Sequence, residues 1–104
     1  MPATLDRART ARETPRVRKA KASGRQAGRI LSLTFENGEK RVFDIGRLIA
    51  RGGLFEPLKD YDAFNEFEVL PYGRGLEWGC GADLSRDTLY HDSMYVGTVR
   101  RLGE

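Results

Sequence analysis

Residues 30–45 read ILSLTFENGEKRVFDI, and this stretch decides the fold class. From residue 31 to residue 35, large apolar side chains alternate with polar ones, which is the period-two pattern of a strand with one buried face. The alternation resumes over residues 41–45. Asn37-Gly38 lies between the two halves and favours a two-residue type I′ turn, in which both central residues take a positive φ. The stretch therefore predicts an antiparallel β-hairpin.

The residues that follow the hairpin predict short helices. Asp44 can cap a helix whose apolar side chains fall on one face over residues 45–49, and Gly52-Gly53 can end it with a left-handed C-cap. Leu54 and Phe55 are then expected to return to the core. Pro57 suits the first position of a further helical turn.

Further strands are predicted on both sides of this region. Residues 67–69 and residues 76–78 alternate apolar with polar side chains on either side of a Pro- and Gly-containing bend, which indicates a second strand pair. Val17 lies among basic residues, as in an edge strand protected by charge. Ser85 is expected to be the N-cap of another helix. A last short strand is expected over residues 95–99.

These patterns predict one α+β domain: a small antiparallel sheet, made of the hairpin around Asn37-Gly38 and a second strand pair, with two or three short helices. The chain has 104 residues, which is room for one domain. Its single cysteine, Cys80, permits no internal disulfide, and secretion is not suggested. No apolar run approaches the roughly 20 residues of a membrane span, and the N-terminus lacks the apolar segment of a signal peptide. We therefore expect a cytoplasmic protein of a prokaryote or its phage.

Charge divides the chain unevenly. Residues 1–29 hold nine basic and two acidic side chains, a net charge of +7, whereas residues 30–104 carry a net charge of −4. Residues 1–14 contain almost no large apolar side chains, so we expect a disordered basic arm there and a single domain over residues 15–104. Such asymmetry can indicate a polyanionic partner. Alternatively, the arm only keeps the protein in solution or docks on the acidic body of the same chain.

No catalytic or metal site is predicted. A metal site needs more imidazole or thiolate ligands than His91 and Cys80 supply, and a nucleophilic cysteine needs a base that is held by a third group. Asp44, Asp83 and Asp87 could meet near one end of the sheet, but helix capping is sufficient to explain two of them. The nucleotide-binding glycine motifs are absent. We expect no cofactor and no small-molecule substrate.

Several short motifs occur in an order that resembles one bacterial family. They are RVRKA at residues 16–20, LTFENGE at 33–39, VFDI at 42–45, LI at 48–49, GLFEPLKD at 53–60, EW at 77–78 and GADLSRDTLY at 81–90. The most specific part is the pattern W-x-x-GADL-x-x-DTLY. The family is catalogued as domain of unknown function twenty-four forty-two, and the resemblance covers roughly residues 15–96.

The resemblance implies a small α+β fold with short sheets and helices. It implies little chemistry, because the family has no established activity. Members are similar to partners that are encoded beside other small proteins in toxin–antitoxin-like pairs. Some members are fused to a helix-turn-helix DNA-binding domain.

The leading hypothesis is a non-enzymatic protein-interaction module, either antitoxin-like or a regulatory partner in a phage or its host. One expected contact surface is an exposed sheet edge that is open to strand addition. The other is the segment from Trp78 to Tyr90, with Trp78, Asp83 and Tyr90 as its contact residues. Trp78 can equally belong to the core.

The alternative hypothesis is a nucleic-acid-associated protein. Its basic residues near the folded body could contact phosphates without reading sequence, because no aromatic side chains lie among them to stack on bases. These residues are Arg16, Arg18, Lys19, Lys21, Arg25 and Arg29.

Overall fold

The computed structural model describes residues 14–98, and the first 13 residues of the expected arm and residues 99–104 lie outside this range. Thr14, the last residue of that arm, is only 4% exposed. The strands are β1 (Val17–Ala22), β2 (Ile30–Phe35), β3 (Glu39–Asp44), β4 (Phe67–Val69), β5 (Gly75–Trp78), β6 (Asp83–Ser85) and β7 (Met94–Thr98). The helices are α2 (Gly46–Arg51), α3 (Tyr61–Asn65) and α4 (Arg86–His91), with 3₁₀ turns η1 (Gly53–Lys59) and η2 (Pro71–Gly73).

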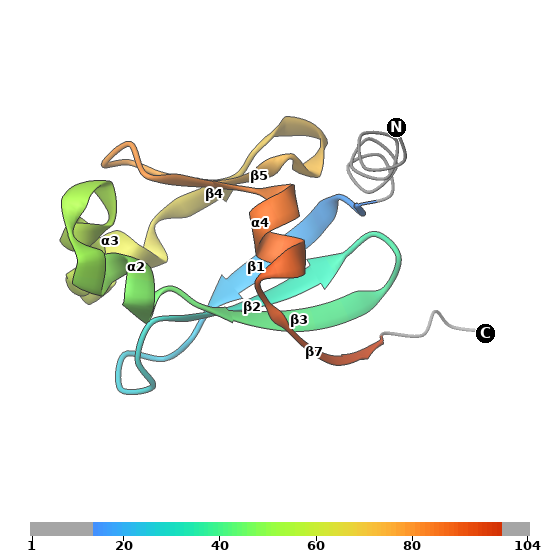
Figure 1. Cartoon of the computed structure of the whole chain (residues 1–104), viewed down its shortest axis with the longest axis horizontal. Helices are drawn as coiled ribbons and strands as arrows, with labels where there is room; N and C mark the ends of the chain where they lie inside the picture. Colours follow the sequence, from blue (N-terminus) through green and yellow to red (C-terminus); the bar gives the residue numbers. More distant parts are fainter. Residues whose placement is uncertain (1–13, 99–104) are drawn as a thin grey trace, which may run out of the picture.

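The strands form two antiparallel sheets (Figure 1). The larger sheet has the order β1-β2-β3-β7, and the smaller has the order β4-β5-β6. The α+β fold class, the hairpin and the second strand pair are therefore confirmed. Strand β6 was not predicted, because its three residues directly precede the helix that the sequence does predict.

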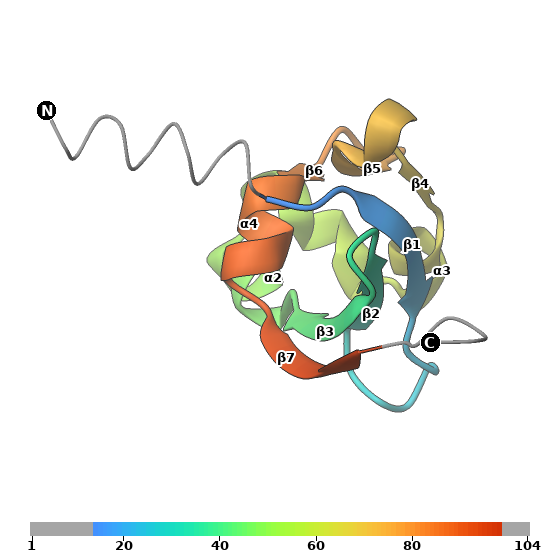
Figure 2. The same cartoon turned by 90° about the vertical axis from the view of Figure 1, so that its right-hand side faces the viewer.

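One core lies between the two sheets. Figure 2 shows the strands as a curved wall that runs from β7 through β3, β2 and β1 to β4, β5 and β6, with α4 on the remaining side. The buried apolar side chains of this core come from both sheets and from the helices. They are Val17, Leu31, Leu33, Phe35, Phe43, Ile45, Ile49, Leu58, Phe64, Leu76, Trp78, Ala82, Leu84 and Leu89. Among residues 14–98, no helix combines the length and the apolar character that crossing a bilayer requires.

The hairpin turn differs from the predicted type. Thr34 pairs with Lys40, so the loop contains residues 36–38 rather than two residues. Gly38 has a φ of 90°, whereas Asn37 does not take a positive φ. The Asn37 side chain instead accepts a hydrogen bond from the backbone N–H of Glu39 at 3.0 Å. The prediction of a type I′ turn is therefore wrong, because one left-handed glycine in a three-residue loop is sufficient to reverse the chain.

The helix that follows the hairpin begins at Gly46, one residue after Ile45. The N-cap is Ile45, so the prediction of Asp44 as the cap is wrong, although the Asp44 carboxylate does accept a hydrogen bond from the N–H of Gly46 at 2.8 Å. The helix ends at Gly52, which has a φ of 85°. The expected return of Leu54 to the core is wrong, because Leu54 is 63% exposed on η1.

The start of α4 is confirmed. Ser85 is the N-cap, and its hydroxyl accepts a hydrogen bond from the N–H of Thr88 at 3.2 Å. Leu84 and Leu89, on either side of this cap, are both buried. The cap therefore fixes the point at which the chain turns from β6 into the helix that closes the wall.

Candidate functional site

Trp78 is a core residue. Its side chain is 2% exposed, and its Nε1–H donates a hydrogen bond to the backbone carbonyl of Phe64 at 2.8 Å. The rings of Phe55 and Phe67 lie 6.3 Å and 5.9 Å from the indole, in edge-on and tilted arrangements. A side chain that is 2% exposed presents almost no surface to a partner. The prediction of Trp78 as a contact residue is therefore corrected.

Tyr90 lies in a polar network with Glu39 and Arg41. Its hydroxyl donates to Glu39 Oε2 at 2.8 Å, and Arg41 Nη1 donates to Glu39 Oε1 at 2.8 Å. The guanidinium of Arg41 lies 4.6 Å above the Tyr90 ring. Arg41 also donates to the side chain and to the carbonyl of Ser93, at 2.7 Å and 3.1 Å. This network connects β3 to the end of α4 and to the start of β7, so it gives Tyr90 a structural role.

The network also changes two pKa values. Burial would by itself raise the pKa of Glu39, but the hydrogen bonds from Tyr90, Arg41 and Asn37 and the charge of Arg41 lower it below its usual 4.5. The hydrogen bond to Glu39, together with burial, raises the pKa of Tyr90 above 10.0. Both shifts hold the pair as a carboxylate and a neutral phenol. That arrangement stabilises the fold and does not activate either group for proton transfer.

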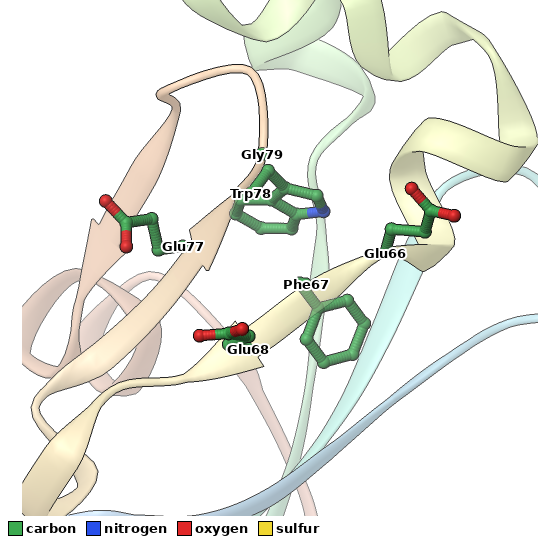
Figure 3. A pocket seen from close by; sticks show the side chains of 6 residues that line it. All are labelled: Glu66, Phe67, Glu68, Glu77, Trp78 and Gly79. Atoms are coloured by element: carbon green, nitrogen blue, oxygen red, sulfur yellow. The ribbon is translucent and has the colours of Figure 1, made fainter.

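Asp83 belongs to a row of acidic side chains on the smaller sheet. In the strand register Glu68 faces Glu77, and Glu77 faces Asp83, and all three are exposed. Like charges placed opposite one another destabilise a sheet. Glu68 and Glu77 border a cavity of about 380 Å³, shown in Figure 3 with Glu66, Phe67, Trp78 and Gly79. Within residues 14–98, no group of three or more His, Cys, Asp or Glu residues is arranged to hold a metal ion.

Cys80 and His91 interact with different parts of the chain. The thiol of Cys80 is exposed and donates to the carbonyl of Leu54 at 3.4 Å. His91 Nε2 lies 3.5 Å from the hydroxyl of Thr14, and its ring packs edge-on against Tyr90. Neither side chain has the other as its hydrogen-bond partner.

The structure separates the six basic residues of the nucleic-acid hypothesis. Arg29 donates to the carbonyls of Leu58 and Lys59 and lies over Tyr61, so it connects the loop before β2 to η1. Arg25 pairs with Asp62 at 3.1 Å and also lies over Tyr61. Both side chains therefore have interaction partners within the domain.

The other four basic residues are exposed, at the start of or along β1. Lys19 pairs with Thr34 and Lys21 pairs with Ser32. Along β2 these two partners alternate with the core residues Leu31, Leu33 and Phe35, so they lie on the other side of the strand, where Thr34 is itself buried. Lys40 of β3 pairs with the opposite side of Thr34. Three lysines therefore share the outer face of the larger sheet. Lys40 was not among the residues predicted from the sequence, although the hairpin register could have placed it there.

Strand β7 is an edge of the larger sheet. It pairs with β3 on one side, and no other described strand pairs with it. Its sequence, MYVGT, has no charged residue. Met94, Tyr95 and Val96 are 67%, 53% and 55% exposed. The predicted final strand is thus confirmed over residues 94–98, whereas Val99 lies outside the described residues. The strand presents three large apolar side chains to solvent.

Comparison with known protein families identifies a match for most of the described chain. No curated protein and no solved structure matches the chain. The family described as "Protein of unknown function (DUF2442)" matches residues 26–95, which include both sheets except β1 and the end of β7. This match covers more than half of the sequence, and the chain therefore belongs to the family Protein of unknown function (DUF2442).

Proposed function

We propose that this protein is a non-enzymatic protein-interaction module that receives an extended segment of a partner protein along β7. The observation that carries the proposal is the exposure of Met94, Tyr95 and Val96 on an uncharged edge strand. The outward backbone groups of such a strand can pair with an added strand, and its side chains provide the apolar contacts.

The two edges of the larger sheet differ in a way that favours β7. The β1 edge carries Arg18, Lys19 and Lys21, and charged side chains on an edge strand oppose the addition of another strand. The β7 edge has no such protection. Its pairing with β3 contains a bulge between Lys40 and Arg41, which leaves Val96 exposed and without an opposite residue. Because a bulge partly protects an edge, the absence of charge is what distinguishes β7 from β1.

The separation of Cys80 from His91 supports a role without catalysis. A nucleophilic cysteine needs a general base within hydrogen-bond reach, and that base needs a third group to orient it. Here the thiol donates to the backbone carbonyl of Leu54, and the Nε2 of His91 lies 3.5 Å from the hydroxyl of Thr14. In the Tyr90–Glu39 pair the phenol is neutral and the carboxylate is ionised, so neither group is activated for proton transfer. This pair therefore also supports a role without catalysis.

An antitoxin-like function is the specific form of this proposal, with a small protein as the partner that inserts its strand. A regulatory partner from a phage or its host is the other form. Both forms use the same surface on this chain, and both require that a partner bind without nucleic acid.

Affinity capture of the tagged protein from its host, with and without nuclease, tests the proposal when three chains are compared. They are the unaltered chain, Val96→Lys on β7 and Leu54→Lys on η1. Both substitutions add one positive charge at an apolar side chain that is more than half exposed, and circular dichroism checks that both variants fold. We expect one nuclease-resistant protein at about one copy per chain, recovered equally with Leu54→Lys and at least tenfold less with Val96→Lys. Equal recovery with both variants, or recovery through nucleic acid only, would refute the proposal.

A further inference from the structure

The outer face of the larger sheet gathers positive charge that the sequence distributes over two distant segments. Lys19 and Lys21 come from β1, and Lys40 comes from β3. The strand pairing places Lys19, Thr34 and Lys40 in one row across the sheet, and Lys21 beside Ser32 in the next row. All three lysines are exposed. None of them forms an ion pair with another described residue.

From this arrangement we infer that the outer face of β1, β2 and β3 binds the phosphate backbone of duplex nucleic acid. This surface is distinct from the β7 edge and does not depend on the function proposed for that edge. It also differs from the arm hypothesis. It includes Lys40, which lies far from the arm in sequence, and excludes Arg25 and Arg29, which have partners inside the domain.

The spacing of the lysines suits a chain of phosphates. Lys19 and Lys21 are two residues apart on one strand, about 6.6 Å, and Lys19 and Lys40 are two strand spacings apart, about 10 Å. A point charge at each of these positions can meet a different phosphate of a regular backbone. Ser32 is exposed beside Lys21 in the second row, and serine hydroxyls are frequent donors to phosphate oxygens.

The rest of this face favours a duplex over the other polyanions. No aromatic side chain lies among the outward residues of β1, β2 and β3, so single-stranded bases have nothing to stack on. An acidic protein partner would need a central apolar or aromatic anchor. Between the lysines this face offers Ser32, the buried Thr34 and the half-buried Val42, and none of these is a large exposed apolar or aromatic side chain. Binding through such a face is electrostatic and independent of base sequence.

The salt dependence of binding tests the inference on the full chain. Three neutralised phosphates contribute about −2.7 to the slope of log affinity against log salt, which is a loss of roughly 40-fold between 50 and 200 mM salt. We expect Lys19→Gln/Lys21→Gln/Lys40→Gln to weaken binding at 50 mM salt at least tenfold and to make the slope about 2.7 less steep. The probes are two labelled duplexes of unrelated sequence.

A matched control removes the same charge elsewhere. Arg47→Gln/Arg51→Gln/Lys59→Gln alters three exposed basic residues on α2 and η1 and should leave the slope unchanged. An equal loss in this control would show that only the total charge matters and would overturn the inference. Four other results would overturn it too: no duplex binding at 50 mM salt, no effect of the first triple variant, a strong preference for one duplex, or equal affinity for polyglutamate.

Discussion

Replacing Tyr90 by Phe removes one hydroxyl from the network that connects β3, α4 and β7. The Phe ring can keep the edge-on contact with Phe35, at 5.1 Å between centroids, and the position under Arg41. The variant therefore loses mainly the hydrogen bond to Glu39. A hydrogen bond to a charged group contributes about 1.5–3 kcal/mol, and Glu39 is 24% exposed and keeps its bonds from Arg41 and Asn37. We expect a loss near the lower limit, about 1–1.5 kcal/mol, which is a fall in Tm of about 5–10 °C for a domain of this size.

The effect should depend on pH, because the acceptor is a carboxylate. The pKa of Glu39 is lowered in the folded protein, so the stability that its ionised form contributes is fully present above 4.5 and is lost as the pH falls through the lowered value. The difference in Tm between the unaltered chain and Tyr90→Phe should therefore be larger at pH 7 than at pH 3. The pKa of Tyr90 is raised in the folded protein, so its effect on stability changes with pH in the opposite direction. The stability that the neutral phenol contributes is lost only as the pH rises through a value above 10.0.

Thermal unfolding followed by circular dichroism at both pH values measures these differences. Tyr72→Phe is the control, because Tyr72 is 75% exposed and has no side-chain hydrogen bond within the described chain. It should leave the Tm unchanged at both pH values. If Tyr90→Phe changed the Tm by less than about 1 °C, or by the same amount at pH 3 and pH 7, the structural role assigned to Tyr90 would be wrong.

Three further substitutions test the core, a turn and a cap, each by urea unfolding followed by far-ultraviolet circular dichroism. Trp78→Phe should lower the free energy of unfolding by about 2–4 kcal/mol, because it leaves the Phe64 carbonyl buried without its donor and removes ring volume; a loss below 1 kcal/mol would contradict the buried position. Gly73→Ala should cost about 1–3 kcal/mol, because Gly73 has a φ of 62° and a Cβ there would lie 2.9 Å from the Val17 nitrogen, whereas Gly24→Ala, in open space, should cost less than half as much. Ser85→Ala should cost about 1 kcal/mol through the lost cap of α4, and an unchanged stability would show that the cap contributes nothing.

The elements that the sequence predicts are those whose signals are local. The hairpin over residues 30–45 combines alternation with a glycine turn, and the cap at Ser85 needs only the residues that follow it. Strand β6 could not be separated from that cap, because a three-residue strand has no period of its own. The exposure of Leu54 could not be predicted either, since the direction of a 3₁₀ turn depends on what packs against it.

The candidate surfaces depend on pairing and packing, and here the sequence predicts less. The sequence does not show whether Trp78 belongs to the core or to an interface. Its hydrogen bond to the Phe64 carbonyl in the structure assigns it to the core. Lys40 and Lys19 lie 21 positions apart along the chain, but both pair with Thr34, so they lie in one row across the sheet. Conversely, Arg29 is basic and near the arm in sequence, but its guanidinium donates to the Leu58 carbonyl and lies over the Phe64 ring. Charge counted along a sequence cannot distinguish these two cases.

The two proposed surfaces belong to one sheet, so binding at one affects the other. A strand added at β7 would lie at the opposite edge from Lys19 and Lys21, with β2, β3 and β7 between them. Its outward side chains would extend the same face that holds the three lysines. An acidic segment there would weaken duplex binding through the field it adds, and a basic one would strengthen it. The coupling must be reciprocal, since each ligand changes the affinity of the other by the same factor. Duplex affinity is therefore measured with and without a saturating concentration of the partner. The direction of the change reports the sign of the charge that the partner adds to the face with the three lysines. An unchanged affinity would show that the charged side chains of the partner lie away from this face.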